Sequence, residues 1–182
     1  MFIMISSNDL MVFYLGLELQ SLALYVLASF KRNDQLSSES GLKYFVLSAL
    51  SSGLLLYGCS LIYGFSGSTN FDQISNNISE VQYGLTLGIV FILVGLAFKI
   101  SAVPFHMWAP DVYQGSPTSV TIFFAILPKI AALSVFIRFL YVPFINLIDQ
   151  WQTIIIFCVH CLNGLWGGCC YRTKKFKTSD GL

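Results

Sequence analysis

The chain has 182 residues, of which 55% are apolar and only 10% are charged, and its mean hydropathy is +0.72. A soluble domain carries about 25% charged residues, and a globule of this size cannot bury so much apolar surface, so the composition indicates an integral membrane protein. The net charge of +1 excludes the basic footprint that nucleic-acid binding needs.

Five apolar segments follow one another along the chain, and each is close to the ~20 residues that a helix needs to cross a hydrocarbon core. We expect helices because unpaired backbone polar groups are too costly in lipid. The sequence therefore predicts an all-α, polytopic bundle of about five spans, the third of them broken at Pro104. The predicted spans are 10–30, 44–65, 83 to about 108, about 119 to 142, and 151 to about 168.

The connecting segments are polar, and their charges differ between the two sides of the membrane. With five spans, the basic loop 31–43 and the basic tail fall on one side, whereas Asp9, Asp72, Glu80 and Asp149 fall on the other. The positive-inside rule places the Lys/Arg-rich side in the cytoplasm, or in the matrix of a mitochondrion. Arg138 is on the acidic side, and we expect it to reach the interface by snorkelling. The N-terminal segment lacks the features of a cleaved signal, so we expect it to stay in the membrane.

Two further patterns carry no strong functional signal. The cysteines of "CVHC" (158–161) and "CC" (169–170) do not have the spacing of a zinc site, so no metal site is expected. "GLTLG" (84–88) has the spacing of small residues that lets membrane helices pack closely.

Three ionisable residues lie inside the predicted spans: Glu18, Lys99 and Lys129. If all three faced lipid, the cost would be on the order of 8–10 kcal/mol, so they must face protein, water or each other. One interpretation is structural, with Glu18 paired to Lys99 or Lys129 to hold helices together. The other is proton transfer, because an amine that moves between a dry environment and a carboxylate can bind and release a proton near neutral pH.

The segment "FKISAVPFHMWAPDVYQGSPT" (98–118) interrupts the third span. Pro104 removes a backbone donor, and a broken membrane helix often marks an ion site. His106, directly after the break, titrates between pH 5 and 8 and is a candidate proton carrier. The alternative is a plain interfacial loop anchored by Trp108 and Tyr113. Pro128 is expected to kink the fourth span beside Lys129.

Three motifs resemble one family: "LGLELQSLALYVLASFKR", "SSESGLKYFVLSALSSGLLLYGCSLIYG" and "GLAFKISAVPFHMWAPDVYQGSPTSVT". They are similar to the antiporter-like membrane subunits of respiratory complex I, the proton-pumping NADH:ubiquinone oxidoreductase, and above all to its subunit 2. These subunits are related to Mrp-type sodium/proton antiporters. The resemblance covers residues 4 to about 156.

The resemblance implies a fold and a set of site residues. Members contain two inverted five-helix repeats, and residues 1–157 match helices five to eight and the start of the ninth. Residues 158–182 diverge as the end of the last span and a basic tail. Glu18 matches the glutamate of the fifth helix, Lys99 the lysine of the broken seventh helix and Lys129 that of the eighth. The first two form a coupling pair in the family, the third passes protons toward the central axis, and His106 lies in the broken-helix region.

The resemblance also implies a function. The chain is expected to contribute a Glu/Lys proton half-channel to complex I in the mitochondrial inner membrane, coupled to NADH oxidation by ubiquinone. The FMN and iron–sulfur clusters are expected in other subunits, with no cofactor in this chain. Expected partners are other membrane-arm subunits, the lipid bilayer and a second chain that supplies the family's missing helices. Two alternatives stay open: a structural or assembly fragment without a complete proton path, and a cation/proton antiporter.

Overall fold

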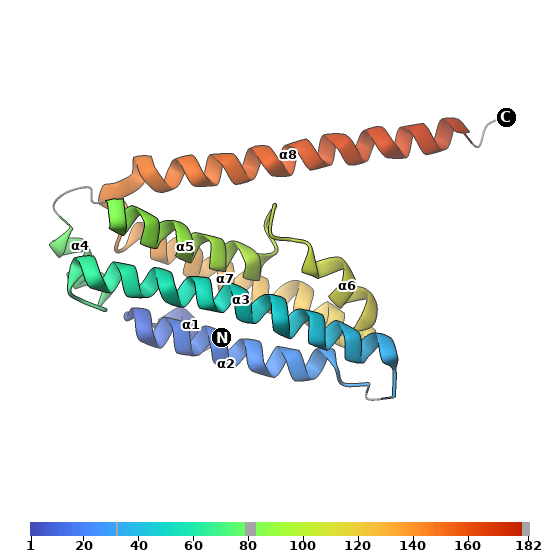
Figure 1. The fold of residues 1–182 in the computed structure, drawn as a ribbon, viewed down its shortest axis with the longest axis horizontal. Coiled ribbons are helices and arrows are strands. Elements are labelled where there is room, and N and C mark those ends of the chain that lie inside the picture. Colours follow the sequence, from blue (N-terminus) through green and yellow to red (C-terminus); the bar gives the residue numbers. More distant parts are fainter. Residues whose placement is uncertain (32, 79–82, 180–182) are drawn as a thin grey trace.

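The computed structural model describes residues 1–31, 33–78 and 83–179, with side chains up to residue 164. Within these ranges the chain is helical, and the only β pairing is an isolated bridge between Asp9 and Asn70. The helices are α1 (Phe2–Ser6), α2 (Leu10–Ala28), α3 (Gln35–Ser66), α4 (Phe71–Asn77), α5 (Tyr83–Ile100), α6 (Trp108–Gly115), α7 (Thr118–Tyr141), the 3₁₀ turn η1 (Ile145–Leu147) and α8 (Ile148–Ser179) (Figure 1).

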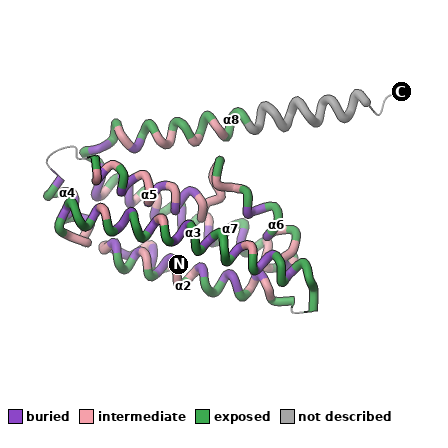
Figure 2. Tube along the Cα trace, viewed as in Figure 1, coloured by how far each residue is buried: buried purple, intermediate pink, exposed green. Residues whose placement is uncertain are grey.

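Five of these segments are long and apolar enough to cross a membrane: α2, α3, α5, α7 and Ile145–Gly164, which includes the first part of α8. The predicted all-α, five-span architecture is therefore confirmed. Helix α3 lies at the centre and packs against α2, α5 and α6, while α7 packs against α5 and α1. Helix α8 runs along the outside of the bundle, and its described part is mostly exposed or half-buried (Figure 2).

The second span begins nine residues earlier than predicted. Most of the polar segment 31–43 forms the first turns of α3, and the Asp34 side chain caps this helix by accepting a hydrogen bond from the Leu36 amide at 3.1 Å. With 32 residues, α3 is about 48 Å long, so it extends well beyond a hydrocarbon core of about 30 Å. A polar sequence can therefore stay helical here because it lies outside the lipid.

The third span is broken as predicted, but the break begins before Pro104. Helix α5 ends at Ile100, and Ser101 adopts a left-handed conformation with φ 58°. The Ala102 amide donates to the Ala97 carbonyl at 2.8 Å, and the Ser101 amide donates to the Phe98 carbonyl at 3.0 Å. This pair of bonds is the Schellman pattern that ends helices, so backbone capping stops the helix before the proline is reached.

Other boundaries also differ from the prediction. The fifth span starts at η1 and α8 instead of residue 151, and the α8 backbone continues as a helix through the tail that was expected to be separate. The short helices α1 and α4 were not predicted. Both helices have fewer than two turns, so their sequences are too short to show a helical period. They fold because tertiary contacts bury Met4 in α1 and Phe71 in α4.

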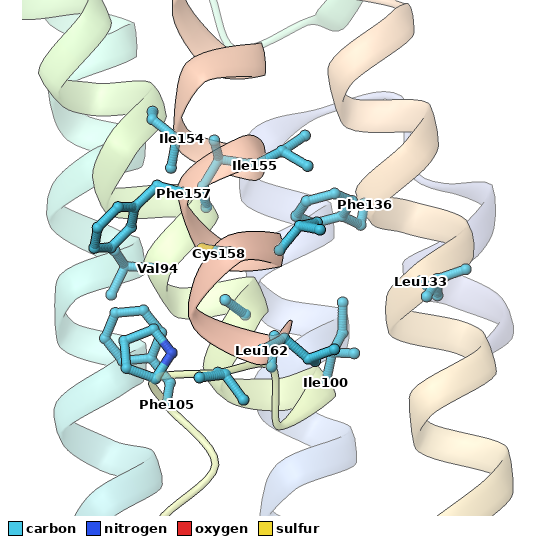
Figure 3. Close-up of a pocket in the computed structure, with 16 residues that line it drawn as sticks. Val94, Ile100, Phe105, Leu133, Phe136, Ile154, Ile155, Phe157, Cys158 and Leu162 are labelled. Carbon is cyan, nitrogen blue, oxygen red and sulfur yellow. The ribbon is translucent and has the colours of Figure 1, made fainter. Parts of the chain in front are cut away.

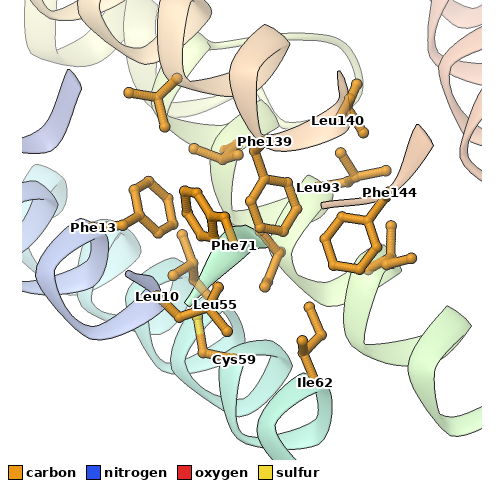
Figure 4. Packing of buried hydrophobic residues seen from close by; sticks show 14 of the residues in the cluster. Leu10, Phe13, Leu55, Cys59, Ile62, Phe71, Leu93, Phe139, Leu140 and Phe144 are labelled. Atoms are coloured by element: carbon orange, nitrogen blue, oxygen red, sulfur yellow. The ribbon is translucent and has the colours of Figure 1, made fainter. Parts of the chain in front are cut away.

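Buried side chains form two clusters. The larger contains aromatic rings from α2, α4 and α7, and Phe139 contacts Phe13, Phe71 and Phe144 with ring centroids 5.0–6.2 Å apart (Figure 4). The smaller lies near α6, where Trp108 stacks on Tyr44 at 4.8 Å. The two clusters hold opposite ends of the bundle and leave a polar site between them.

Glycines allow α3 and α5 to approach closely. A Cβ atom on Gly58 would lie 2.8 Å from the Gly88 carbonyl oxygen, and one on Gly84 would overlap the Phe65 ring. The "GLTLG" motif therefore serves helix packing in this structure, as its spacing predicted.

Candidate functional site

Lys99 is the polar centre of the bundle. Its ammonium Nζ donates hydrogen bonds to Ser21 Oγ at 2.7 Å and to Ser48 Oγ at 2.5 Å. Lys99 comes from α5, Ser21 from α2 and Ser48 from α3, so three spans meet at one amine. Both serines are almost fully buried.

The position of Lys99 on α5 also favours a positive charge. It lies in the last turn of the helix, one residue before the end at Ile100. The negative end of the helix dipole stabilises cations at this position. The break after Ile100 thus creates a favourable electrostatic environment for an amine inside the membrane.

Glu18 lies near this amine but does not form an ion pair with it. The Glu18 carboxylate acts electrostatically on Lys99, whereas every ion pair within 4.0 Å among the described residues involves Lys43. Glu18 Oε1 is buried without a hydrogen-bond partner. The direct ion pair that the sequence allowed between Glu18 and Lys99 is therefore not formed among the described residues, and the predicted coupling of the two groups stays a prediction.

A small cavity of about 10 Å³ adjoins the amine, close to the ~10–15 Å³ that one water molecule occupies. Gln20 shares this cavity with Lys99, and its Oε1 is buried without a hydrogen-bond partner. Pro128 of α7 lines the same cavity. The cavity is lined by Met4, Leu17, Gln20, Ser21, Leu24, Tyr44, Lys99, Pro128 and Ala132.

Lys129 lies apart from the other two ionisable groups. Its Nζ is 5.5 Å from the centroid of the Tyr113 ring, in a cation–π contact with α6. No hydrogen bond or ion pair among the described residues joins Lys129 to Glu18 or Lys99. Pro128 brings this part of α7 to the small cavity, but the Lys129 side chain is directed to the aromatic cluster.

His106 lies in the turn between α5 and α6, half-buried, with Nδ1 buried and unpartnered. No hydrogen bond connects its ring to Lys99 in the described residues. Trp108, which the interfacial-loop alternative assigned to the membrane surface, is only 5% exposed, and its Nε1 donates to the Phe98 carbonyl at 2.9 Å. That assignment is wrong for Trp108, because the ring covers the broken end of α5 inside the bundle.

Arg138 is bonded to groups at the α1–α4 end of the bundle. Its Nη1 donates to the Ile5 carbonyl at 2.7 Å and its Nη2 contacts Asn8 Oδ1 at 3.5 Å. Asn8 Nδ2 in turn donates to Asp72 at 2.9 Å. The arginine therefore joins α7 to the N-terminal segment, and Asn8 joins that segment to α4; the expected snorkelling of Arg138 stays a prediction.

The sequence did not indicate two polar features of the structure. The first is Ser48: α3 contains many serines, and only the fold shows which one contacts Lys99. The second is an ion-pair cluster in which Lys43 contacts Glu39 at 2.9 Å and Asp111 at 3.0 Å. This cluster ties the start of α3 to α6 near the bundle end, and its side chains are about half exposed.

An apolar cavity beside α8 is a different feature. It measures about 360 Å³ and separates α5 and α7 from α8 (Figure 3). Ala97, Ile100 and Phe105 line it, along with other apolar side chains and the thiol of Cys158. Because its walls carry almost no polar atoms, this cavity has no groups for acid–base chemistry.

No group of three or more potential metal ligands occurs among the described side chains. Cys158 and Cys161 are free and half-buried on α8, whereas Cys169 and Cys170 lie outside the described side chains.

The fold and the site define a class: a multi-pass helical membrane protein in which a broken helix places a lysine amine among buried hydroxyls and beside a carboxylate. Residues 7–176 match the family described as NADH:quinone oxidoreductase/Mrp antiporter, transmembrane. The chain belongs to this family.

Two curated relatives illustrate the similarity. The chain is 80% identical over 157 residues to the NADH-quinone oxidoreductase subunit N of Pelagibacter ubique (strain HTCC1062), which covers 86% of this chain and 33% of the relative. It is 60% identical over 171 residues to the NADH-quinone oxidoreductase subunit N of Rhodospirillum rubrum. This match covers 92% of this chain and 35% of the relative. The chain thus spans about one third of the length of these relatives.

Solved structures agree with this assignment. Respiratory complex I from Thermus thermophilus with bound aureothin contains a chain that matches with a TM-score of 0.68 and 39% identity, over 75% of this chain and 30% of that one. A chain of the Mrp complex from Dietzia sp. DQ12-45-1b matches with a TM-score of 0.68 and 27% identity. This match covers 75% of this chain and 26% of that one.

Proposed function

We propose that this chain contributes a proton half-channel to the membrane arm of respiratory complex I. Glu18 and Lys99 form its coupled acid–base pair, Lys129 receives protons on the far side of the aromatic cluster, and His106 joins the path at the break. The observation that carries the proposal is the half-buried Lys99 side chain, whose amine donates to two neutral hydroxyls, together with the buried Glu18 oxygen that has no hydrogen-bond partner. Intramembrane ionisable residues of this kind are functional-site candidates by default.

The proposal assigns the chemistry of electron transfer elsewhere. NADH oxidation and ubiquinone reduction, with the flavin and iron–sulfur clusters they need, belong in this proposal to other subunits of the NADH:ubiquinone reductase. This chain holds and moves protons with its own side chains. Its proposed partners are the neighbouring antiporter-like subunits, the lipid bilayer and the polypeptide that carries the remaining two thirds of the subunit, on the same chain or another.

The proposed orientation follows from charge. Lys31 and Lys43 lie near the α2–α3 end of the bundle, whereas Asp9 and Asp72 lie at the end with α1 and α4 (Figure 1). Arg32 and Glu80 lie outside the described residues. We place the α2–α3 end on the negative side of an energy-transducing membrane. The named relatives are bacterial, so they give no support to a mitochondrial inner membrane.

The test is a substitution in the complete subunit, assembled in complex I. Lys99→Ala and Glu18→Ala are each expected to lower the number of protons pumped per NADH oxidised by this subunit's share, because each substitution removes one acid–base group of its path. Pumping is measured in membrane vesicles with a pH-sensitive dye, and assembly by native gel. Lys31→Ala removes an exposed lysine of the connector and serves as the matched control.

The two alternatives give different results. Normal pumping in both variants, together with loss of assembly on truncation, would support a structural role. Sodium/proton exchange by the subunit alone in liposomes would support the antiporter.

A further inference from the structure

We propose that Ser21 and Ser48 are positioning residues that hold the Lys99 ammonium in a site separate from Glu18. The two hydroxyls are the partners of the amine when it is not paired with the carboxylate. This inference rests on the proposed function, because it describes how the acid–base pair of the half-channel is kept open.

The hydrogen bonds of the hydroxyls fit this role. An ammonium has three donors and no acceptor, so each serine must accept with an oxygen lone pair. The Ser21 hydroxyl donates its own hydrogen to the Leu17 carbonyl at 2.8 Å, which leaves its lone pairs for Lys99. Ser48 accepts from the same amine at 2.5 Å. Two of the three N–H groups are thereby bound to neutral acceptors.

The neutrality of the acceptors matters. Burying an unpartnered ammonium has a high desolvation cost. A carboxylate partner would offset part of this cost, but the amine would then be held in an ion pair. Hydroxyl acceptors solvate the ammonium without neutralising it. Glu18 therefore keeps a buried oxygen without a partner while Lys99 remains hydrogen-bonded.

The distance between the two positions is short. Glu18 and Ser21 are three residues apart on α2, and side chains at this spacing have Cβ atoms about 5–6 Å apart on one helix face. The third N–H of Lys99 is free to turn toward the adjoining cavity, where the Gln20 oxygen also lies without a partner. In this proposal, rotation of the flexible lysine side chain exchanges a serine for the carboxylate.

The experiment uses the complete subunit in assembled complex I. Ser48→Ala and Ser21→Ala are each expected to reduce the protons pumped per NADH in the same direction as Lys99→Ala but by less, because each removes one of the two hydrogen bonds that hold the amine. Ser48→Thr and Ser48→Val introduce side chains of the same shape, but only threonine keeps the hydroxyl. Comparing the two variants therefore separates the effect of the hydroxyl from the effect of side-chain packing. Threonine is expected to retain pumping and valine to lose it.

Two further variants complete the design. Ser52→Ala is the matched control, because Ser52 is buried one turn further along α3 and donates to the Ser48 carbonyl instead of contacting Lys99. In a Lys99→Ala background, Ser48→Ala is expected to cause no additional loss. If an alanine variant assembles poorly, the ratio of protons to NADH in the assembled fraction still reports on the role.

The outcomes separate this inference from the proposed function. If Lys99→Ala lowers pumping but Ser48→Ala and Ser21→Ala do not, the positioning role is wrong and the half-channel stands. Equal losses in the threonine and valine variants, or an additive loss in the Lys99→Ala background, also overturn it. If Lys99→Ala leaves pumping intact, the proposed function and this inference fall together.

Discussion

Lys99 and Arg138 are both basic residues in apolar helices, but the structure stabilises their charges differently. Lys99 bonds to two side-chain hydroxyls at the end of a helix, and these contacts can be exchanged for others. Arg138 bonds to a backbone carbonyl, which is fixed in space by α1. The difference agrees with the proposed proton-carrying role of Lys99 and with a structural role for Arg138, whose guanidinium is held by a fixed backbone carbonyl.

Replacement of Arg138 tests the contribution of its hydrogen bond to the Ile5 carbonyl. Arg138→Ala is expected to destabilise the subunit by about 1.5–3 kcal/mol, the value of a hydrogen bond to a charged group, because the Ile5 carbonyl loses its donor. The measurement is the thermal unfolding midpoint of the detergent-solubilised complex. Arg138→Lys, which keeps one charged donor, is expected to recover part of the loss. A midpoint unchanged in both variants would contradict the assigned role.

At the scale of elements, the close contact of α3 with α5 positions the site. Ser48 lies on α3 and Lys99 on α5, so the distance between these helices sets the hydrogen bond between them. Gly58 faces Gly88 and Ile92 across the interface, with no room for a side chain. Small residues allow backbones to approach where lipid gives no hydrophobic driving force.

Gly58→Ala tests this packing. The added Cβ would lie 2.7–3.0 Å from Ile92 and the Gly88 carbonyl, so the helices must separate, at an expected cost of about 1–3 kcal/mol. Gly53→Ala is the matched control on the same helix, because a Cβ there meets nothing within 4 Å and alanine has the higher helix propensity, by about 1 kcal/mol. The thermal unfolding midpoint is expected to fall for Gly58→Ala and to stay the same or rise for Gly53→Ala. The same shift of the midpoint in both variants would argue against tight packing at Gly58.

At the scale of the whole molecule, the five spans place the connectors alternately on two sides of the membrane. The α2–α3 connector and α4 lie at opposite ends of α3, which is itself longer than the hydrocarbon core (Figure 1). Exposed apolar side chains cover much of the bundle between these ends, as expected for helices that face lipid or other helices.

Single cysteines introduced at two exposed asparagines test this topology. In a cysteine-free background, Asn33→Cys and Asn76→Cys are expected to react with a membrane-impermeant maleimide from opposite sides. Asn33 should be labelled only in inside-out vesicles and Asn76 only in right-side-out vesicles. Labelling of both from one side would contradict the five-span arrangement, and the reverse pattern would contradict only the proposed orientation.

Composition and apolar segment length were sufficient to predict the class and most of the span count, because the cost of unpaired backbone groups leaves few solutions in a membrane. The sequence also identified Glu18, Lys99 and Lys129, since ionisable residues stand out in an apolar segment. It could not place the end of α5, because a serine takes the left-handed capping position where a glycine would have given the signal.

Which polar groups contact one another depends on the packing of the helices. Ser48 and Lys99 are 51 residues apart, and nothing in either local sequence distinguishes Ser48 from the other serines of α3. Likewise, the bonds from Arg138 to Ile5 and the stacking of Trp108 on Tyr44 depend on how whole helices pack. Hydrophobic length is a local property and can be read along the chain, whereas the partner of a buried charge is set by the helices that surround it.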